Sequence, residues 1–294
     1  MASIKHWLLA TRPKTLPAGT VPVVLGSSIA FCDGKLNILI AVLCLLCSAF
    51  MQIIANFVNE IYDFKRGADT KERTGPQRMV ASGIISAKEM SVGAIVLGII
   101  TVILGGIIIL NSGIWILITG VVALIFAWLY TGGPYPLAYH GLGDICVLIF
   151  FGLVAVNGTY YAQTLELSPI CLLASFAPGF LSMNILGINN FRDIDTDKKA
   201  GKFTLSTKLG RENCIFLYRS LMMLAFIVPV VLYVIKSSVM FLFPLALIPF
   251  GLKLINDMKT KNGTALNSVL AGTGQMVFFH GILSSLGFIL LKIL

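Results

Sequence analysis

The apolar residues of this chain form long uninterrupted blocks, separated by shorter polar segments. A membrane core about 30 Å thick is crossed by a helix of about 20 apolar residues, and blocks of that length are not expected from alternating or amphipathic patterns. The blocks predict about nine membrane-spanning helices, at 18–32, 38–58, 91–110, 114–131, 143–162, 169–190, 213–235, 239–256 and 266–291. We therefore expect an all-α, polytopic membrane protein that forms a single transmembrane domain over residues 1–294.

Composition agrees with this pattern. Hydrophobic residues make up 57% of the 294 residues and charged residues only 12%, whereas soluble domains are about 45–50% apolar and about 25% charged. The class of soluble proteins is therefore excluded. Lys5, Arg12 and Lys14 precede the first apolar block. This start is unlike a cleavable signal peptide, so we expect the block to remain as a membrane helix.

The basic residues lie almost entirely on one side of the predicted membrane. If the spans alternate in direction, all 22 Lys and Arg residues lie on the N-terminal side except Lys35, Lys236 and Lys292. The positive-inside rule places that side in the cytoplasm, so we expect an external C-terminus and location in a bacterial inner membrane. The net charge of +9 then reflects orientation beside anionic membrane lipid, and we expect no nucleic-acid partner.

The acidic residues gather on the same side, in two clusters. All 13 share the predicted cytoplasmic side except Asp33 and Glu166. One cluster follows the second span and the other follows the sixth. Helical residues four apart lie on the same face. The clusters therefore predict two polar stripes, one of Asn59 and Asp63 and the other of Asn189, Asp193 and Asp197.

Stacked carboxylates repel each other, so a bound cation is a physical reason for such stripes. Mg²⁺ prefers carboxylate oxygens, keeps several waters and is usually completed by substrate phosphates. The alternative is that the acids only neutralise neighbouring cations in water. The recurrence of the pattern favours a metal site, and it suggests an internal duplication that makes the stripes face each other. The predicted metal ligands are Asn59, Asp63, Asp69, Asn189, Asp193 and Asp197.

The two acid-bearing loops, at about 59–90 and 189–212, also carry basic residues suited to a diphosphate. A metal bridges phosphate oxygens while cations neutralise the remaining charge. The predicted diphosphate-binding residues are Lys65, Arg78, Arg192, Lys202 and Lys208. Arg78 is the first candidate, because it lies between the turns at 75–76 and 82–83, away from the bilayer edge.

These motifs resemble the UbiA superfamily of intramembrane aromatic prenyltransferases. The family pattern is a nine-helix bundle around a central cavity, with two Asp-rich motifs on cytoplasmic helix ends. Stretches similar to the 1,4-dihydroxy-2-naphthoate polyprenyltransferase branch cover 12–16 (RPKTL), 63–70 (DFKRGADT), 75–78 (GPQR) and 130–144 (YTGGPYPLAYHGLGD). The similarity extends over nearly the whole chain. One departure is Glu60, where many relatives carry Asp.

The resemblance implies a reaction and a cofactor. A polyprenyl diphosphate would be joined to 1,4-dihydroxy-2-naphthoate with loss of diphosphate and CO₂, giving demethylmenaquinone. Mg²⁺ would be held with the catalytic residues Asp63, Asp193 and Asp197. Contacts to the aromatic substrate or to an allylic cation would come from Arg12, Lys14, Tyr130, Tyr135, Tyr139, His140 and Asp144. Asp144 is equally well explained as a helix cap, and the base is either Asp193 or Asp195.

Two alternatives remain at this point. A prenyltransferase of the same superfamily could use another acceptor, 4-hydroxybenzoate or homogentisate, and only the branch-specific loops argue against this. A membrane transporter would place charged residues near the bilayer midplane on broken helices. The predicted spans hold almost no ionisable residues, which favours the enzyme.

Overall fold

The computed structural model describes residues 3–68 and 75–294, and within these ranges the chain is helical without β-strands. Eight helical stretches in this part of the chain are long and apolar enough to cross a membrane, and one further apolar helix is shorter. The predicted all-α fold of about nine membrane helices is therefore confirmed.

The elements follow one another along the chain as helices joined by short connections. The first half contains α1 (Ile4–Ala10), η1 (Pro13–Thr15), α2 (Leu16–Cys32), α3 (Ile38–Lys65), α4 (Ala87–Ser112), α5 (Ile114–Leu129) and η2 (Leu137–His140). The middle contains α6 (Gly143–Val147), η3 (Leu148–Val154), α7 (Ala155–Thr164), α8 (Pro169–Arg192) and α9 (Ile194–Lys199). The remainder contains α10 (Leu205–Lys236), η4 (Val239–Leu247), α11 (Ile248–Thr260), η5 (Gly263–Ala265) and α12 (Leu266–Ile293).

Some helices differ from the spans predicted by the apolar blocks. Helix α3 continues beyond its block to Lys65, which places the first polar stripe on regular helix. The span predicted at 143–162 is built from α6, the π-helical segment η3 and α7. Gly152 of η3 lies against Gly179 of α8, where a Cβ on Gly152 would lie 2.8 Å from the Gly179 Cα. A π-helical turn widens the helix locally and often occurs near functional sites.

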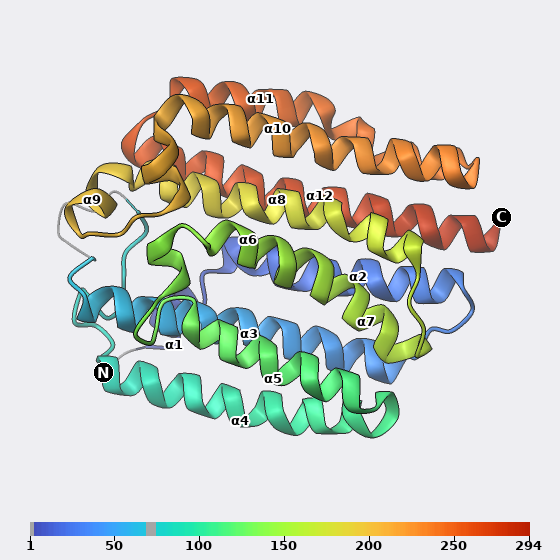
Figure 1. The fold of residues 1–294 in the computed structure, drawn as a ribbon, viewed down its shortest axis with the longest axis horizontal. Coiled ribbons are helices and arrows are strands. Elements are labelled where there is room, and N and C mark those ends of the chain that lie inside the picture. Colours follow the sequence, from blue (N-terminus) through green and yellow to red (C-terminus); the bar gives the residue numbers. More distant parts are fainter. Residues whose placement is uncertain (1–2, 69–74) are drawn as a thin grey trace.

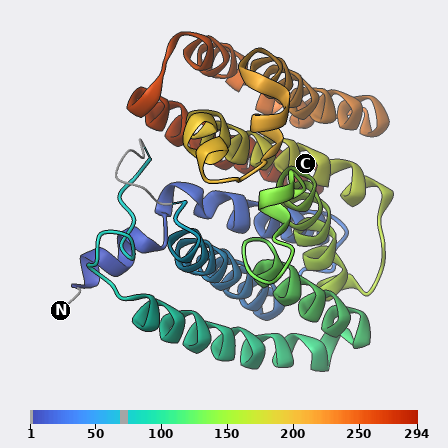
Figure 2. The same cartoon turned by 60° about the vertical axis from the view of Figure 1, so that its left-hand side comes forward.

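Helix α2 is the central helix of the bundle. It packs against α3, α7, α8 and α12, while α4 and α11 lie at opposite edges (Figures 1 and 2). Gly26 permits its close approach to α7, because a Cβ at this position would lie 2.5 Å from the carbonyl oxygen of Val156. The N- and C-terminal ends lie at opposite ends of the bundle in Figure 1, as an odd number of spans requires.

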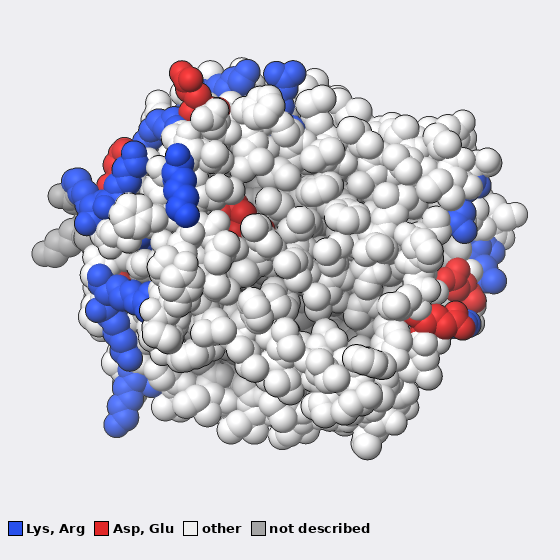
Figure 3. Space-filling model, viewed as in Figure 1, with Lys and Arg blue, Asp and Glu red and all other residues white. Residues whose placement is uncertain are grey.

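Charge is concentrated at one end of this bundle. Figure 3 shows most of the visible Lys and Arg side chains gathered at the end that carries α9 and the N-terminus in Figure 1. We call this the α9 end. The broad face between the two ends is almost entirely uncharged in the same view. This distribution is that of a membrane protein whose basic loops share one side.

Candidate active site

A cavity of about 320 Å³ lies within the bundle and reaches the α9 end, where Asp197 and Lys202 line it. Its walls come from the start of α2 and from α3, α5, α6, η3 and α8. The volume falls in the range of small-molecule sites, roughly 300–1,000 Å³. Polar lining residues at the α9 end are Arg12, Asn59, Arg78, Asn189, Asn190, Asp193, Asp197 and Lys202. Both predicted stripes therefore contribute to the wall of a single cavity.

The interior of the cavity is mostly apolar. On α3 the lining extends from Asn59 back to Cys47, which corresponds to roughly 18 Å along a helix at 1.5 Å per residue. Another part of the wall is formed by small and aromatic residues of α5 and η3, among them Ala123, Phe126 and Phe150. The rings of Phe126 and Phe150 are 5.1 Å apart between centroids. The cavity thus joins a charged head region to an apolar channel.

Asn59 is the α3 residue that two arginines approach. Its Oδ1 accepts hydrogen bonds from Nη2 of Arg12 at 2.8 Å and from Nη2 of Arg78 at 3.1 Å. Arg12 has a left-handed backbone (φ 53°), which is uncommon for a residue other than glycine. The backbone amide and hydroxyl of Thr15 both donate to the Arg12 carbonyl oxygen. This turn directs the Arg12 side chain to the cavity wall.

Asp63 lies one turn further along α3 and is 2% exposed. Its Oδ1 accepts a hydrogen bond from the Tyr139 hydroxyl at 2.8 Å, and its Oδ2 lies 3.5 Å from Arg78 Nη2 and 3.6 Å from Lys202 Nζ. Burial, together with the Asp63 carboxylate, raises the pKa of Tyr139 above its ordinary value. The phenol therefore stays protonated and acts as a hydrogen-bond donor that orients the carboxylate.

The second stripe begins at the end of α8. Arg192 donates to both carboxylate oxygens of Asp193, from Nε at 2.8 Å and from Nη2 at 2.6 Å. Its Nη1 donates to Oδ1 of Asn267 on α12 at 2.8 Å. The Arg192 side chain is fully buried and is not among the cavity-lining residues. Arg192 therefore positions Asp193, and the structure does not bring it to the place predicted for a diphosphate.

Lys202 connects the two stripes. Its Nζ lies 3.6 Å from Asp63 Oδ2 and 4.0 Å from Asp197 Oδ1. Asp63 comes from α3 and Asp197 from α9, so helix ends far apart in sequence converge on a single ammonium group. The positive ammonium group attracts both negative carboxylates, so it couples the two stripes electrostatically.

The donor set at this end fits a hard cation that is completed by substrate. Among the described residues, no group of three or more His, Cys, Asp or Glu side chains is close enough to hold a metal alone. Asn59 and Asn189 line the same cavity as Asp193 and Asp197. Mg²⁺ is commonly bound by a few protein oxygens together with waters and substrate phosphates. A metal that needs all of its ligands from the protein does not fit these residues. The predicted ligand Asp69 lies outside the described residues.

Several other predicted site residues join the loops at the α9 end of the bundle. Lys208 Nζ donates to the His140 carbonyl oxygen at 2.7 Å, and the Phe203 amide donates to the Tyr139 carbonyl oxygen at 3.0 Å. Tyr135 is exposed and stacks on the His140 ring, with centroids 3.6 Å apart. The Phe203 and Lys208 contacts tie the loop at 130–142 to the segment before α10 and to the first turn of α10. Tyr139, His140 and Lys208 therefore hold the loops together and are absent from the cavity lining.

The remaining predictions divide between the cavity and the surface. Tyr130 lines the cavity. Lys14 and Lys65 are exposed, and Lys65 lies over the Tyr62 ring, 5.5 Å from its centroid. Asp195, one of the two candidate bases, has a 76% exposed side chain and pairs with Arg211 at 3.0 Å. Of the two candidates, only Asp193 reaches the cavity.

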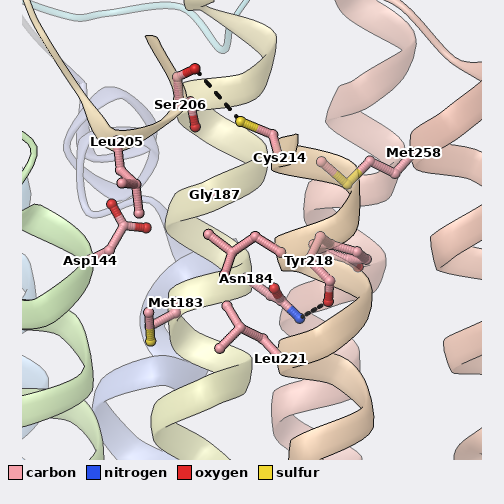
Figure 4. A pocket seen from close by; sticks show the side chains of 11 residues that line it. Asp144, Met183, Asn184, Gly187, Leu205, Ser206, Cys214, Tyr218, Leu221 and Met258 are labelled. Atoms are coloured by element: carbon pink, nitrogen blue, oxygen red, sulfur yellow. Dashed lines mark hydrogen bonds between the residues drawn. The ribbon is translucent and has the colours of Figure 1, made fainter. Parts of the chain in front are cut away.

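Asp144 faces a separate small hollow between α6, α8 and α10 (Figure 4). Asn184 and Tyr218 also line this hollow, and the Asn184 Nδ2 donates to the Tyr218 carbonyl oxygen at 3.1 Å. Asp144 lies in the first turn of α6, where a carboxylate interacts favourably with the helix dipole. The structure thus places Asp144 away from the main cavity.

Glu60 has a role that the sequence did not indicate. Its Oε1 accepts a hydrogen bond from the Val80 amide at 2.8 Å, and its Oε2 lies 3.9 Å from Arg78 Nη1. The residue is 1% exposed and is not part of the cavity wall. Glu60 therefore anchors the loop that presents Arg78. The signal available in the sequence was the departure from Asp at this position, which gives a longer side chain.

Tyr139→Phe tests the orienting role of the phenol. If Asp63 is a metal ligand, as the sequence predicts, we expect kcat to fall about ten- to a hundredfold, the usual effect of removing the hydrogen-bond partner of a ligand. Tyr233→Phe is the matched control, because Tyr233 is an exposed residue near the far end of α10. We expect it to leave kcat unchanged. An unchanged kcat in Tyr139→Phe, measured as diphosphate release by protein of equal thermal stability, would show that Asp63 does not depend on Tyr139.

The fold is that of an integral membrane protein, and its cavity joins a charged end to an apolar channel. The UbiA prenyltransferase family model matches residues 20–291, and the chain belongs to this family. The chain is 36% identical to the 1,4-dihydroxy-2-naphthoate octaprenyltransferase of Haemophilus influenzae, over 98% of this chain and 96% of that protein. It is 34% identical to the enzyme of the same name from Mycobacterium leprae, over 93% and 92% of the two chains.

A solved structure shows the same fold. The UbiA homologue from Archaeoglobus fulgidus bound to GPP and Mg²⁺ has a TM-score of 0.66 and 16% sequence identity, covering 95% of this chain and 99% of that chain. The membership predicted from the Asp-rich motifs is confirmed.

Proposed function

We propose that this protein transfers a polyprenyl group from polyprenyl diphosphate to 1,4-dihydroxy-2-naphthoate. The observation that carries the proposal is the cavity that joins paired Asn/Asp stripes and basic side chains to an apolar channel. The octaprenyltransferase names of relatives at 34% and 36% identity support the choice of acceptor. Transfer to 4-hydroxybenzoate or homogentisate, and transport, have no comparable support.

The reaction replaces one bond of each substrate. The C–O bond between the prenyl chain and diphosphate breaks, and diphosphate leaves with the electron pair. A ring carbon of the naphthoate forms the new C–C bond, and the carboxylate leaves as CO₂, returning its bonding electrons to the ring. The product is the quinol form of demethylmenaquinone.

We propose that Mg²⁺ is the cofactor, as in the Archaeoglobus fulgidus homologue bound to GPP and Mg²⁺. The residues that would hold it are Asn59, Asp63, Asn189, Asp193 and Asp197, together with Asp69. When bound, the ion offsets the negative charge that grows on the departing diphosphate. The fit rests on the oxygen donors that line the head of the cavity.

The cations and aromatic rings of this chain supply the other contributions. Arg78 and Lys202 line the head of the cavity and neutralise phosphate charge there. Tyr130, Phe126 and Phe150 line the adjoining wall, where their π-faces stabilise a positive charge on the prenyl chain. The apolar channel excludes water, which would otherwise intercept that cation.

The acceptor is placed on the side of the cavity formed by the start of α2. Arg12 is positioned to pair with the naphthoate carboxylate, and Asp193 is the candidate base that reaches the cavity. We place the α9 end and the N-terminus in the cytoplasm of a bacterial cell, because the basic loops gather there. Polyprenyl diphosphate then enters with its head at that surface and its tail in the bilayer.

An acceptor panel tests the proposed function. Purified protein with Mg²⁺ and one polyprenyl diphosphate is offered dihydroxynaphthoate, 4-hydroxybenzoate and homogentisate, and prenylated products are identified by mass. We expect product with dihydroxynaphthoate and little with the other two. Preference for either of the other acceptors would overturn the assignment.

A further inference from the structure

Two buried polar atoms of the cavity wall have no hydrogen-bond partner within the described residues. They are Oε1 of Gln52 on α3 and Oγ of Ser182 on α8. Gln52 is 8% exposed and Ser182 2%, and both line the cavity. A buried polar atom without a partner costs free energy, and most such atoms in proteins are satisfied. Two of them in one ligand cavity point to polar groups of a ligand.

The two residues lie at the same depth. Gln52 precedes Asn59 by two helical turns on α3, and Ser182 precedes Asn189 by two helical turns on α8. Two turns correspond to roughly 10 Å along each helix. Gln52 and Ser182 therefore line the cavity on two helices at the same depth. This depth is closer to the bilayer centre than the head of the cavity, where the diphosphate is proposed to bind.

The orientation of the Gln52 amide follows from its neighbours. Its Nε2 donates to the Thr15 hydroxyl oxygen at 3.4 Å, and that hydroxyl gives its own proton to the Arg12 carbonyl oxygen at 3.0 Å. Thr15 therefore has no proton left for Gln52, and the amide must turn its nitrogen toward Thr15. Oε1 is left as a pure acceptor, and it requires a donor such as a hydroxyl group.

The polar atoms and the apolar channel lie on different walls. Arg12, Thr15 and Gln52 form a polar patch where the turn before α2 contacts α3, whereas α5 and η3 contribute Phe126 and Phe150. A prenyl chain has no group that could satisfy Gln52 or Ser182. A dihydroxynaphthoate has two hydroxyl donors and a carboxylate, which match Gln52, Ser182 and Arg12.

We propose that Gln52 and Ser182 bind the ring hydroxyl groups of the aromatic acceptor and determine its selection, an inference that rests on the proposed function. Arg12 binds the acceptor carboxylate. Gln52 Oε1 accepts a hydrogen bond from the ring hydroxyl that is farther from this carboxylate. Ser182 contacts the same acceptor from α8. A site built to hydrogen-bond a substrate hydroxyl rejects an analogue that lacks it.

The test compares dihydroxynaphthoate with 1-hydroxy-2-naphthoate, which lacks the second hydroxyl, in the full-length protein with Mg²⁺ and one polyprenyl diphosphate. The ratio of kcat/KM values for the two acceptors measures selection, and the intrinsic reactivity of each acceptor cancels between variants. We expect Gln52→Leu to reduce this preference roughly three- to tenfold, the effect of one neutral hydrogen bond. KM for the diphosphate should stay unchanged. Gln275→Leu, the same substitution at an exposed position of α12, should keep the wild-type ratio.

Ser182→Ala is the second variant. It removes only one oxygen, so the proposal can still be tested if Gln52→Leu does not fold. We expect a higher acceptor KM with an unchanged donor KM. A wild-type preference in Gln52→Leu, or, if that variant does not fold, a wild-type acceptor KM in Ser182→Ala, would show that these atoms bind water, and would overturn the inference while leaving the proposed function intact. Absence of any naphthoate transfer by the wild-type protein would instead reject the proposed function itself.

Discussion

Asp63→Asn and Asp197→Asn are each expected to lower kcat about a thousandfold at saturating substrate. Asp197 lines the head of the cavity, and Asp63 lies buried behind it, within 3.6 Å of Lys202, which lines the same cavity. Asp63 is held by Tyr139 and by Lys202, and Asp197 shares the same Lys202. An Asn side chain keeps the shape and one oxygen but not the charge. The loss should therefore appear in turnover, measured as diphosphate release, with thermal stability in detergent changed much less.

Asp195→Asn is the matched control for Asp197. Both residues belong to the short helix α9, but the Asp195 side chain is 76% exposed and pairs with Arg211 outside the cavity. An exposed ion pair of this kind contributes little to stability. We expect Asp195→Asn to keep wild-type turnover. Equal losses in Asp195→Asn and Asp197→Asn would mean that acidity of α9, and not the cavity carboxylate, supports activity.

Arg78→Met is expected to lower kcat/KM for polyprenyl diphosphate about a hundredfold. The Arg78 side chain is 8% exposed, and Nη2 lies 3.1 Å from Asn59 Oδ1 and 3.5 Å from Asp63 Oδ2. Charge-assisted hydrogen bonds to phosphate are stronger than neutral ones, so loss of this group weakens both donor binding and leaving-group stabilisation. Initial rates over a range of donor concentrations separate the two contributions.

Arg211→Met controls for loss of a basic residue at the α9 end, since Arg211 pairs with Asp195 on the surface. It should keep the donor kcat/KM of the wild type. If Arg78→Met showed an unchanged donor KM and kcat, Arg78 would serve only to join Glu60 and Asp63, and the diphosphate would have to be bound elsewhere.

The sequence predicted the fold well because membrane helices are specified by length and apolarity alone. The exceptions have local causes. The helix of α3 extends past the apolar block, since polar residues continue a helix that has already formed. The π-helical segment η3 could not be predicted from its uniformly apolar sequence, because it depends on the packing of Gly152 against Gly179.

The site was predicted in part. Spacing by four residues placed Asn59, Asn189, Asp193 and Asp197 where they line one cavity, because helical periodicity is a local property. Arg192 was predicted as a diphosphate-binding cation, whereas the structure places it at the last residue of α8, where it contacts Asn267 on α12. Spacing does not reveal this tertiary interaction.

Gln52 and Ser182 were missed for a different reason. Both are single uncharged polar residues within apolar blocks, so the charge pattern does not mark them. Their position two turns before the motif asparagines was a readable signal, since polar side chains within membrane helices tend to mark function.

The most direct test of the central claim is the metal dependence of prenyl transfer by the purified protein. Diphosphate release from polyprenyl diphosphate with dihydroxynaphthoate is measured in EDTA and again after Mg²⁺ is restored in excess. If the two stripes hold Mg²⁺ with the diphosphate, activity falls at least about a hundredfold in EDTA and returns with Mg²⁺. Equal rates with and without the chelator would contradict a metal-bridged diphosphate at these residues.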